Sequence, residues 1–167
     1  MNPETAGSAF SIRPAREADV GAVLRMIRAL AQFERLAHLC VATEAQLCAA
    51  LFGADPAAHV LIAWEGPAAA GFALYFYNFS TFVGRRGVWL EDLWVEPAHR
   101  RRGCAQALLR TLAGIAVERG CGRFEWAVLD WNAPAIDFYR SLGASVLPDW
   151  RIVRVVGPAL DALATPA

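Results

Sequence analysis

Residues Leu90–Leu109 read LEDLWVEPAHRRRGCAQALL, and this stretch decides how we expect the chain to fold. Its first part is apolar apart from one acidic pair, which predicts a strand, and Pro97 ends that strand because proline cannot donate to a ladder. The arginine run Arg100–Arg102 then leads through Gly103 into a segment whose apolar residues repeat with helical spacing. These residues are Ala105, Leu108, Leu109, Leu112, Ile115 and Ala116. The pattern predicts a strand, a basic turn and the start of a helix.

A basic turn at the start of a helix is suited to bind an anion. The N–H groups of the first helical turn have no partner within the helix, and the helix dipole favours negative charge there. Gly103, followed by Cys104 and Ala105, would let a phosphate approach the backbone closely. The P-loop and dinucleotide-binding glycine spacings are absent, and the chain has no lysine. Taken alone, Arg100–Arg102 is also compatible with a solvated basic turn or a nucleic-acid patch.

The residues around the turn resemble a known enzyme family. Arg100-x-x-Gly103-x-Ala105 is similar to the [QR]-x-x-G-x-[GA] signature of the GCN5-related N-acetyltransferase (GNAT) family, in which this turn holds the pyrophosphate of acetyl-CoA. The strand LEDLWV and the later segment WNAPAIDFYRSLGA make the likeness specific, and together they resemble the spermidine/spermine N-acetyltransferase branch from about Ile12 to Val155. The resemblance implies an α+β GNAT acyltransferase fold, with a central mixed, mostly antiparallel sheet of about six to seven strands flanked by helices. It also implies acetyl-CoA as co-substrate and a homodimer.

Sequence patterns predict an order of elements that agrees with this fold. The predicted strands are Phe10–Pro14, His59–Trp64, Ala69–Phe79, Val88–Val95, Arg123–Leu129 and a final hairpin of Ala144–Leu147 and Trp150–Val156. The predicted helices are Ala18–Leu36, one opened by the capping box of Thr43 and Gln46, Gly103–Arg119, one between Asn132 and Gly143, and Pro158–Leu163. We expect residues 1–9 to be a disordered lead and residues 10–163 to form a single N-acetyltransferase domain.

Composition excludes several other classes of protein. With 16 arginines against 16 acidic residues among 167, the chain lacks the basic excess of a general nucleic-acid binder. No apolar run approaches the ~20 residues of a membrane span, and the first residues do not form a secretory signal. The four cysteines form no C-x-x-C pair, which favours reduced thiols and a cytoplasmic protein. The three histidines have no ligand-spaced partners, so we expect no metal site.

Acetyl transfer to an amine requires a base, because a primary ammonium has a pKa near ~10.4. The resemblance implies that Glu91 is this base, acting through water; the alternative is a strand carboxylate that faces solvent or pairs with an arginine. Asp92 points to the opposite face of a regular strand, so the two acids share a site only if the strand bulges. The resemblance implies such a bulge, with the backbone of Leu93, Trp94 and Val95 holding the pantetheine arm and polarising the acetyl carbonyl.

Tyr139 is the candidate general acid. Its phenol has a pKa of about 10, which suits protonation of a leaving thiolate, and the resemblance assigns this role to the tyrosine of the FY pair. The alternative is a helix tyrosine that only packs against its neighbours. The resemblance also implies that Asn132 caps the same helix and contacts the coenzyme. Ala135 departs from the family, which often has serine there, so one polar coenzyme contact is expected to be missing.

The acceptor is expected to be a small cationic amine bound by Glu34, Glu91 and Asp92, although Glu34 could equally be a solvated residue at a helix end. The hairpin before Glu91 carries Arg85 and Arg86 without an acid, which disfavours a long polycation such as spermine. A short diamine or a lysine-like amino acid is therefore expected, with a carboxylate that could pair with either arginine. Two alternatives remain: a protein N-terminal or lysine acetyltransferase, and a non-catalytic acyl-CoA-binding sensor.

Overall fold

The structure is a computed structural model, and it describes residues 10–166. The predicted lead, residues 1–9, lies outside the described residues. The chain divides into two compact units, the first ending at Ala127 and the second running from Val128 onward. Each unit is described by itself below, and the assignment of residues 10–163 to a single domain stays a prediction.

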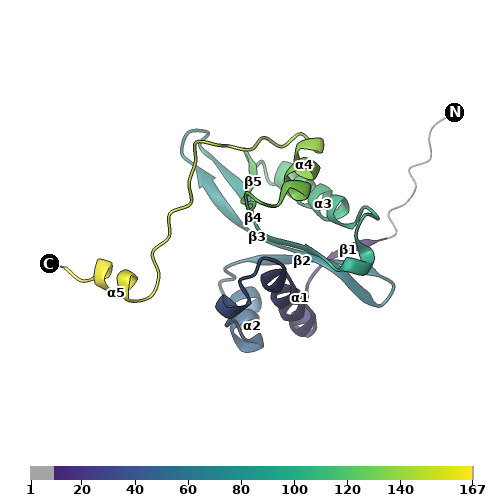
Figure 1. Ribbon diagram of the computed structural model, residues 1–167, viewed down its shortest axis with the longest axis horizontal. Helices are drawn as coiled ribbons and strands as arrows, with labels where there is room; N and C mark the ends of the chain where they lie inside the picture. The colour runs from purple at the N-terminus through teal and green to yellow at the C-terminus, as the bar shows by residue number, and fades with distance from the viewer. Residues whose placement is uncertain (1–9, 167) are drawn as a thin grey trace. The chain divides into compact units, whose positions relative to one another are not determined.

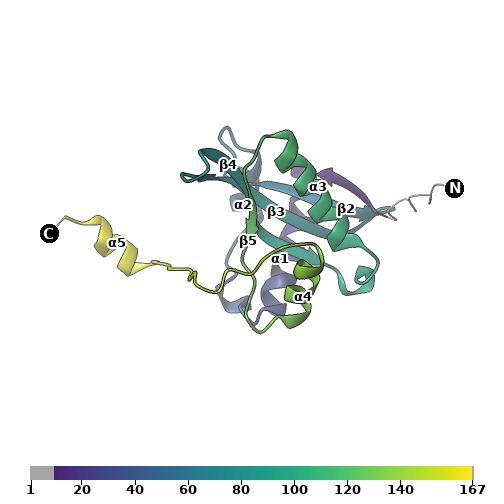
Figure 2. The same cartoon turned by 90° about the horizontal axis from the view of Figure 1, so that it is seen from above.

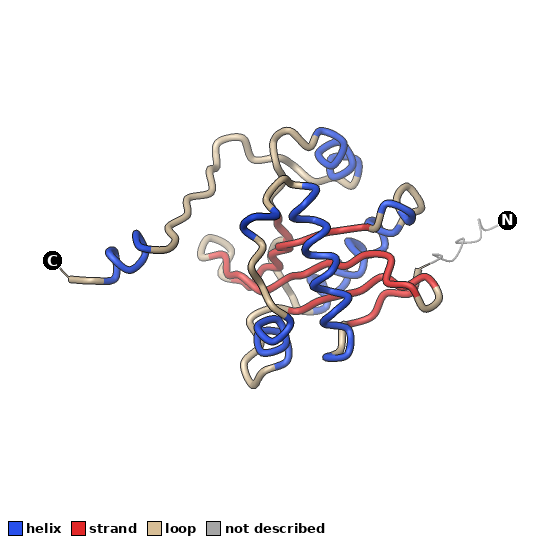
Figure 3. The backbone as a smooth tube through the Cα atoms, turned by 60° about the horizontal axis from the view of Figure 1, so that its bottom comes forward, coloured by secondary structure: helices blue, strands red, loops and turns tan. Residues whose placement is uncertain are grey.

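The first unit is built on a five-stranded sheet with the order β1-β2-β3-β4-β5. Its strands are β1 (Ser11–Pro14), β2 (His59–Glu65), β3 (Ala68–Ser80), β4 (Arg85–Val95) and β5 (Phe124–Trp126). The first four strands pair antiparallel, whereas β4 and β5 pair parallel. A parallel pair needs a crossover, and α3 (Cys104–Glu118) provides it. The predicted mixed, mostly antiparallel α+β fold is confirmed. Figure 3 separates the strands from the helices that cover them.

Helices cover both faces of this sheet. Figure 1 shows α1 (Val20–Phe33) and α2 (Glu44–Phe52) on one face and α3 on the other. Viewed from above, α3 lies across the strands (Figure 2). The predicted capping box opens α2, since the Thr43 hydroxyl accepts a hydrogen bond from the backbone N–H of Gln46. Short 3-10 turns, Glu17–Asp19, Ala37–Leu39 and Pro97–His99, join the larger elements.

The core on the side of α1 and α2 is continuous with the strand that carries the acidic pair. Val23 and Met26 of α1 pack in one cluster with Phe72 of β3 and Trp94 of β4, together with Leu51, Val60 and Ile62. Trp94 therefore points toward α1 and α2. Burial of such side chains contributes roughly 25 cal/mol per Å² of apolar surface, so this cluster fixes the position of β4 against α1.

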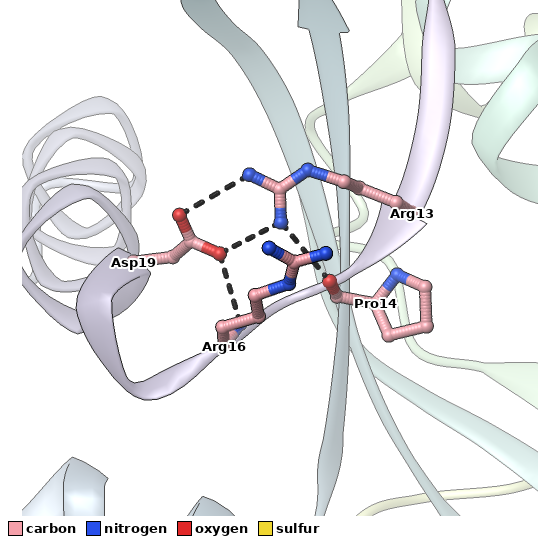
Figure 4. A network of polar contacts seen from close by, with 4 residues as sticks. All are labelled: Arg13, Pro14, Arg16 and Asp19. Carbon is pink, nitrogen blue, oxygen red and sulfur yellow. Dashed lines mark hydrogen bonds and ion pairs between the residues drawn. The ribbon is translucent and has the colours of Figure 1, made fainter.

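The corner between β1 and α1 is held by one carboxylate. The Asp19 side chain accepts hydrogen bonds from Nη1 of Arg13 at 2.9 Å and from the backbone N–H of Arg16 at 2.8 Å (Figure 4). The hydrogen bond from Arg13 is the main reason that the pKa of Asp19 lies below its ordinary value. This contact fixes the direction in which α1 leaves the sheet edge.

The second unit contains two helices, α4 (Ala133–Ser141) and α5 (Pro158–Ala164). The predicted hairpin of Ala144–Leu147 and Trp150–Val156 is wrong, because neither segment forms a strand. The predicted count of six to seven strands is therefore wrong as well, and the described residues contain five. These segments are rich in β-prone residues, but β propensity depends on packing against neighbouring strands, and they have none in the described part of the chain.

Candidate active site

A β-bulge in β4 brings the two acidic residues to one face of the sheet. Tyr75 of β3 pairs with Leu90, and Leu74 pairs with Asp92, so Glu91 is an extra residue without a partner on β3. Asp92 shares the face of Leu74, which is the α1 side. Glu91 lies on the same side, because its carboxylate accepts a hydrogen bond from Trp89, and Trp89 pairs with Phe76. The expected bulge is confirmed.

The charges of Glu91 and Glu34 both act on the carboxyl of Asp92. Burial raises the pKa of Asp92 to about 6, and the nearby charges of Glu91 and Glu34 add to the effect. Glu34 follows the last residue of α1, and burial raises the pKa of its carboxyl as well. The carboxyls of Asp92 and Glu34 thus resist carrying negative charge, and a cation that enters beside them favours their charged forms. The structure thus brings together the three residues predicted to bind an amine.

Trp89 is a site residue that the sequence analysis missed. Its indole Nε1 donates to Oε2 of Glu91 at 2.9 Å, and its ring lies 6.5 Å from the ring of Phe76. This hydrogen bond orients the carboxylate of Glu91 and leaves Oε1 without a hydrogen bond among the described residues. The signal was present in the sequence, since residues two apart on a strand lie on the same face.

The edge of β4 that pairs with β5 has no partner strand among the described residues from Glu91 onward. The register of β4 with β5 runs from Val88 to Leu90, and β4 continues to Val95 with no strand on that side in residues 10–166. Backbone groups of Leu93, Trp94 and Val95 on this edge are thus without a strand partner there. This is the edge expected to hold the pantetheine arm, and that role stays a prediction.

The turn before α3 has the backbone of an anion site. Gly103 adopts a left-handed conformation with φ of 84°, and no side chain caps the helix that starts at Cys104. A Cβ added at Gly103 would meet nothing within 4 Å, so the backbone is open to a ligand. Burial raises the pKa of the Cys104 thiol to about 11, which keeps it protonated. Ala105 follows in the same turn, half-buried.

Two of the three arginines in the turn have different surroundings. Arg101 adopts a left-handed conformation with φ of 56°, and its side chain has no partner among the described residues. Arg102 forms an ion pair with Glu65 at the end of β2, and His99 approaches the same carboxylate at 2.8 Å. This contact was missed, because Glu65 stands 37 residues before Arg102 and no spacing rule links them. Of these two guanidinium groups, that of Arg101 is free to bind phosphate.

Arg100 is fixed on the α1 side of the sheet. Its Nε donates to the carbonyl oxygen of Val95 at 2.9 Å. Its guanidinium carbon lies 4.6 Å from the ring centre of Trp94 and 5.6 Å from that of Phe33, the last residue of α1. Both contacts have the geometry of cation–π interactions. The guanidinium of Arg100 is therefore on the same side as Asp92 and Glu34.

In the second unit, Asn132 caps α4 as predicted. Its side-chain oxygen accepts a hydrogen bond from the backbone N–H of Ala135 at 3.4 Å. Tyr139 is half-buried on α4, with its ring 5.5 Å from that of Phe138. The roles of Asn132 and Ala135 in coenzyme binding, and that of Tyr139 as general acid, stay predictions.

The arginines of the hairpin are badly placed to pair with a carboxylate of the acceptor. Arg86 packs over the ring of Tyr77 at 4.9 Å, on the face opposite Glu91. Arg85 is on the face of Glu91, but the two are six residue steps apart along the strand, roughly 20 Å at 3.3 Å per residue. A lysine-like acceptor spans only on the order of 8 Å. The expected pairing with Arg85 or Arg86 is not supported by this register.

Residues 10–166 contain neither a grouped set of metal ligands nor a membrane-spanning helix. Within that range no three His, Cys, Asp or Glu side chains are grouped so that they could hold a metal ion. None of the helices in that range combines the length and hydropathy needed to cross a bilayer.

Comparison with known proteins gives matches over most of the chain. A family model described as acetyltransferase (GNAT) family matches residues 24–144. The thialysine N-epsilon-acetyltransferase of Mus musculus is 40% identical over 164 residues, covering 92% of this chain and 96% of that protein. The L-ornithine N5-acetyltransferase NATA1 of Arabidopsis thaliana is 33% identical over 197 residues, covering 91% and 86%. Among solved structures, the integron cassette protein VCH_CASS6 from the mobile metagenome of V. cholerae superposes with a TM-score of 0.80 at 25% identity, covering 96% and 100%.

Proposed function

Because the chain belongs to the GNAT acetyltransferase family, we propose that it moves the acetyl group of acetyl-CoA to the primary amine of a small molecule, a lysine-like amino acid or a short diamine. The observation that carries the acceptor class is the bulge in β4, which gathers Glu91 and Asp92 on one face beside Glu34. Relatives named for thialysine and L-ornithine support an amino acid with a side-chain amine.

Each of these residues has a separate role in the direct transfer of the acetyl group from the thioester to the amine. Asp92 and Glu34 hold the ammonium, and Oε1 of Glu91 takes its proton, directly or through water. The neutral nitrogen attacks the thioester carbon, and backbone N–H groups of the open edge of β4 stabilise the developing oxyanion. When the carbon–sulfur bond breaks, the electron pair goes to sulfur and Tyr139 donates the proton that makes the thiol. The nitrogen loses its second proton as the amide forms, and this proton returns to the Tyr139 phenolate, directly or through water. The turn at Gly103 holds the pyrophosphate.

We also propose a cytoplasmic homodimer that does not act on nucleic acid or membranes. The family resemblance supports the dimer. The second unit adds support, because it exposes apolar side chains that a partner would cover, among them Val146, Leu147, Trp150, Ile152 and Val153. Sedimentation of the purified protein distinguishes a dimer from a monomer.

The test is a screen for release of free CoA from acetyl-CoA across amines. The panel contains lysine, ornithine, thialysine, putrescine, spermidine, spermine and a lysine-containing peptide. We expect the short amines and basic amino acids to give the highest kcat/KM. Spermine coming out best by tenfold or more would contradict the acceptor class, and a preference for the peptide would favour a protein acetyltransferase. Binding of acetyl-CoA without turnover of any amine would favour a non-catalytic sensor.

A further inference from the structure

We propose that Arg123, which directly precedes β5, and Glu125 of β5 bind the α-carboxylate and the α-ammonium of an amino-acid acceptor whose side-chain amine lies at Glu91. This inference rests on the proposed function and deepens it, because it names the two residues that separate basic amino acids from diamines. The subsite lies within the first unit.

The register of the sheet places both side chains on the face of the acidic pair. Glu125 pairs with Trp89 of β4, and Trp89 pairs with Phe76 of β3, so these three residues share one face. Arg123 reaches the same face, since its Nε lies 2.6 Å from Oε2 of Glu125. Because the indole of Trp89 donates to the carboxylate of Glu91, this is also the face on which the amine is proposed to bind. Figure 1 shows β5 next to β4 in the sheet.

The ion pair of Arg123 and Glu125 is held in place from β3. Oε2 of Glu125 also accepts a hydrogen bond from Nδ2 of Asn78 at 3.2 Å. Asn78 pairs with Gly87 of β4, and a Cβ at Gly87 would clash with Oδ1 of Asn78, so a glycine leaves the path across β4 open. These contacts engage one oxygen of the carboxylate. Oε1 of Glu125 and the two Nη atoms of Arg123 have no hydrogen bond or ion pair with another described residue.

This pair offers opposite charges to a zwitterion. The planar guanidinium of Arg123 can bind a carboxylate through its Nη atoms, and Oε1 of Glu125 can accept a hydrogen bond from an ammonium. The two side chains are 38% and 30% exposed, so a ligand can reach both. A diamine offers no carboxylate and would place a second cation beside Arg123, which disfavours it.

The spacing on this face matches the length of the acceptor. Glu91 lies two residues beyond Trp89 on β4, and Glu125 lies beside Trp89 on β5, so the Cα atoms of the two acids are about 8 Å apart on the diagonal. In an extended lysine, the side-chain nitrogen and the α-nitrogen are on the order of 7 Å apart. The half-buried rings of Trp89 and Phe76 lie on the same face and offer apolar surface to the methylene chain.

The test compares three acceptors that carry the same side-chain amine: lysine, cadaverine, which lacks the carboxylate, and 6-aminohexanoate, which lacks the α-ammonium. For the wild type, kcat/KM should be highest for lysine. Arg123→Gln should lower the preference for lysine over cadaverine by about tenfold, on the order of one charge-assisted hydrogen bond. Glu125→Gln should lower the preference for lysine over 6-aminohexanoate by a similar factor. KM for acetyl-CoA should be unchanged in both variants.

Arg86→Gln is the matched control. It removes the same charge from the neighbouring strand, but Arg86 packs over Tyr77 on the opposite face, so both preferences should remain those of the wild type. Arg123→Lys keeps the charge but loses the planar fork, so its preference for lysine over cadaverine should fall between those of the wild type and Arg123→Gln.

The outcomes separate the inference from the proposed function. If the wild type acetylates these amines and a preference persists in its variant, the assignment of that residue is wrong, and the proposed function stands. A wild type that prefers cadaverine to lysine would also overturn the inference and leave a short diamine as the acceptor. If the wild type acetylates no amine of the panel, both fail. Thermal unfolding shows whether a loss in Arg123→Gln reflects misfolding, and in that case Arg123→Lys decides.

Discussion

The two units of the chain differ in how their apolar side chains are placed. In the first unit, helices on both faces of the sheet bury a core that includes Phe72, Met26 and Leu108. In the second, no residue among 128–166 is buried, and large apolar side chains such as Trp150 are exposed. The groups proposed to bind coenzyme and amine are mostly in the first unit, and the proposed proton donor, Tyr139, is in the second. Folding and binding should therefore depend on the first unit, and turnover on both.

The largest expected effect is on the stability of the first unit. Phe72 is fully buried, so Phe72→Ala should lower the free energy of unfolding by about 3–5 kcal/mol. At a protein concentration low enough to keep the chain monomeric, Trp150→Ala should lower the free energy of unfolding by less than about 0.5 kcal/mol, because 74% of the Trp150 surface is exposed in the single chain. Urea unfolding monitored by circular dichroism measures both. A similar loss for Trp150→Ala would mean that the second unit buries this side chain in solution, and the contrast between the units would be lost.

Asp92 should destabilise the first unit at neutral pH. Its pKa is raised from 3.8 to about 6, so the folded chain holds this proton more tightly than the unfolded chain. The contribution of Asp92 to stability is therefore most favourable below pH 3.8 and falls as the pH rises toward 6. Asp92→Asn should remove this dependence and stabilise the protein at pH 7 by about 3 kcal/mol. Thermal unfolding from pH 4 to 7 measures it, and a less stable variant at pH 7 would contradict the burial of this carboxylate.

The turn of the first unit should carry coenzyme binding. Gly103→Glu places bulk and negative charge in the space that is open beside Gly103. Acetyl-CoA at 100 times its Kd stabilises a binding protein by about 2.7 kcal/mol, and this gain should disappear in the variant. Gly114→Glu, the same change at an exposed site of α3, is the control and should keep it. A full thermal shift in Gly103→Glu would remove the phosphate assignment.

Tyr139 tests the contribution of the second unit. If its hydroxyl protonates the thiolate, Tyr139→Phe should lower kcat at least roughly tenfold, with the Kd of acetyl-CoA little changed. Tyr77→Phe, on β3 in the first unit, is the matched control and should leave kcat unaltered. An unchanged kcat in Tyr139→Phe would make Tyr139 a packing residue.

The smallest effect is expected at Trp89. Trp89→Phe removes the donor that holds Oε2 of Glu91, so kcat should fall several-fold, on the order of one hydrogen bond. The pH optimum should move upward, as it should in Glu91→Gln, because the amine then deprotonates with less help. The indole Nε1 of Trp64 is buried without a partner among the described residues, so Trp64→Phe removes an N–H that nothing uses. A pH profile in Trp89→Phe identical to that of Trp64→Phe would show that Trp89 does not orient the base.

Local patterns predicted most of the first unit. The strand, turn and helix around Gly103 have strong spacing signals, and the structure follows them with α3 starting one residue later. The bulge at Glu91 was expected only through the family resemblance, because an extra residue in a strand leaves no mark in local periodicity. The contact of Arg102 with Glu65 depends on the register of distant segments, which a single sequence does not contain.

The second unit was predicted less well, for a physical reason. The cap of Asn132 on α4 was predicted because it is a contact over three residues. The prediction of a hairpin around Trp150 was wrong. Its residue types have a high β propensity, but a strand also needs a neighbouring strand to pair with, and residue types alone do not show whether one is present.

The most direct test of the proposed acceptor geometry is the position of the acetyl group on the product. The wild type is incubated with acetyl-CoA and lysine, and the product is analysed by NMR. Because Glu91, Asp92 and Glu34 are proposed to bind the side-chain ammonium and Glu91 to deprotonate it, the acetyl group should be found on the side-chain nitrogen. Acetylation of the α-nitrogen, or none, would contradict the account.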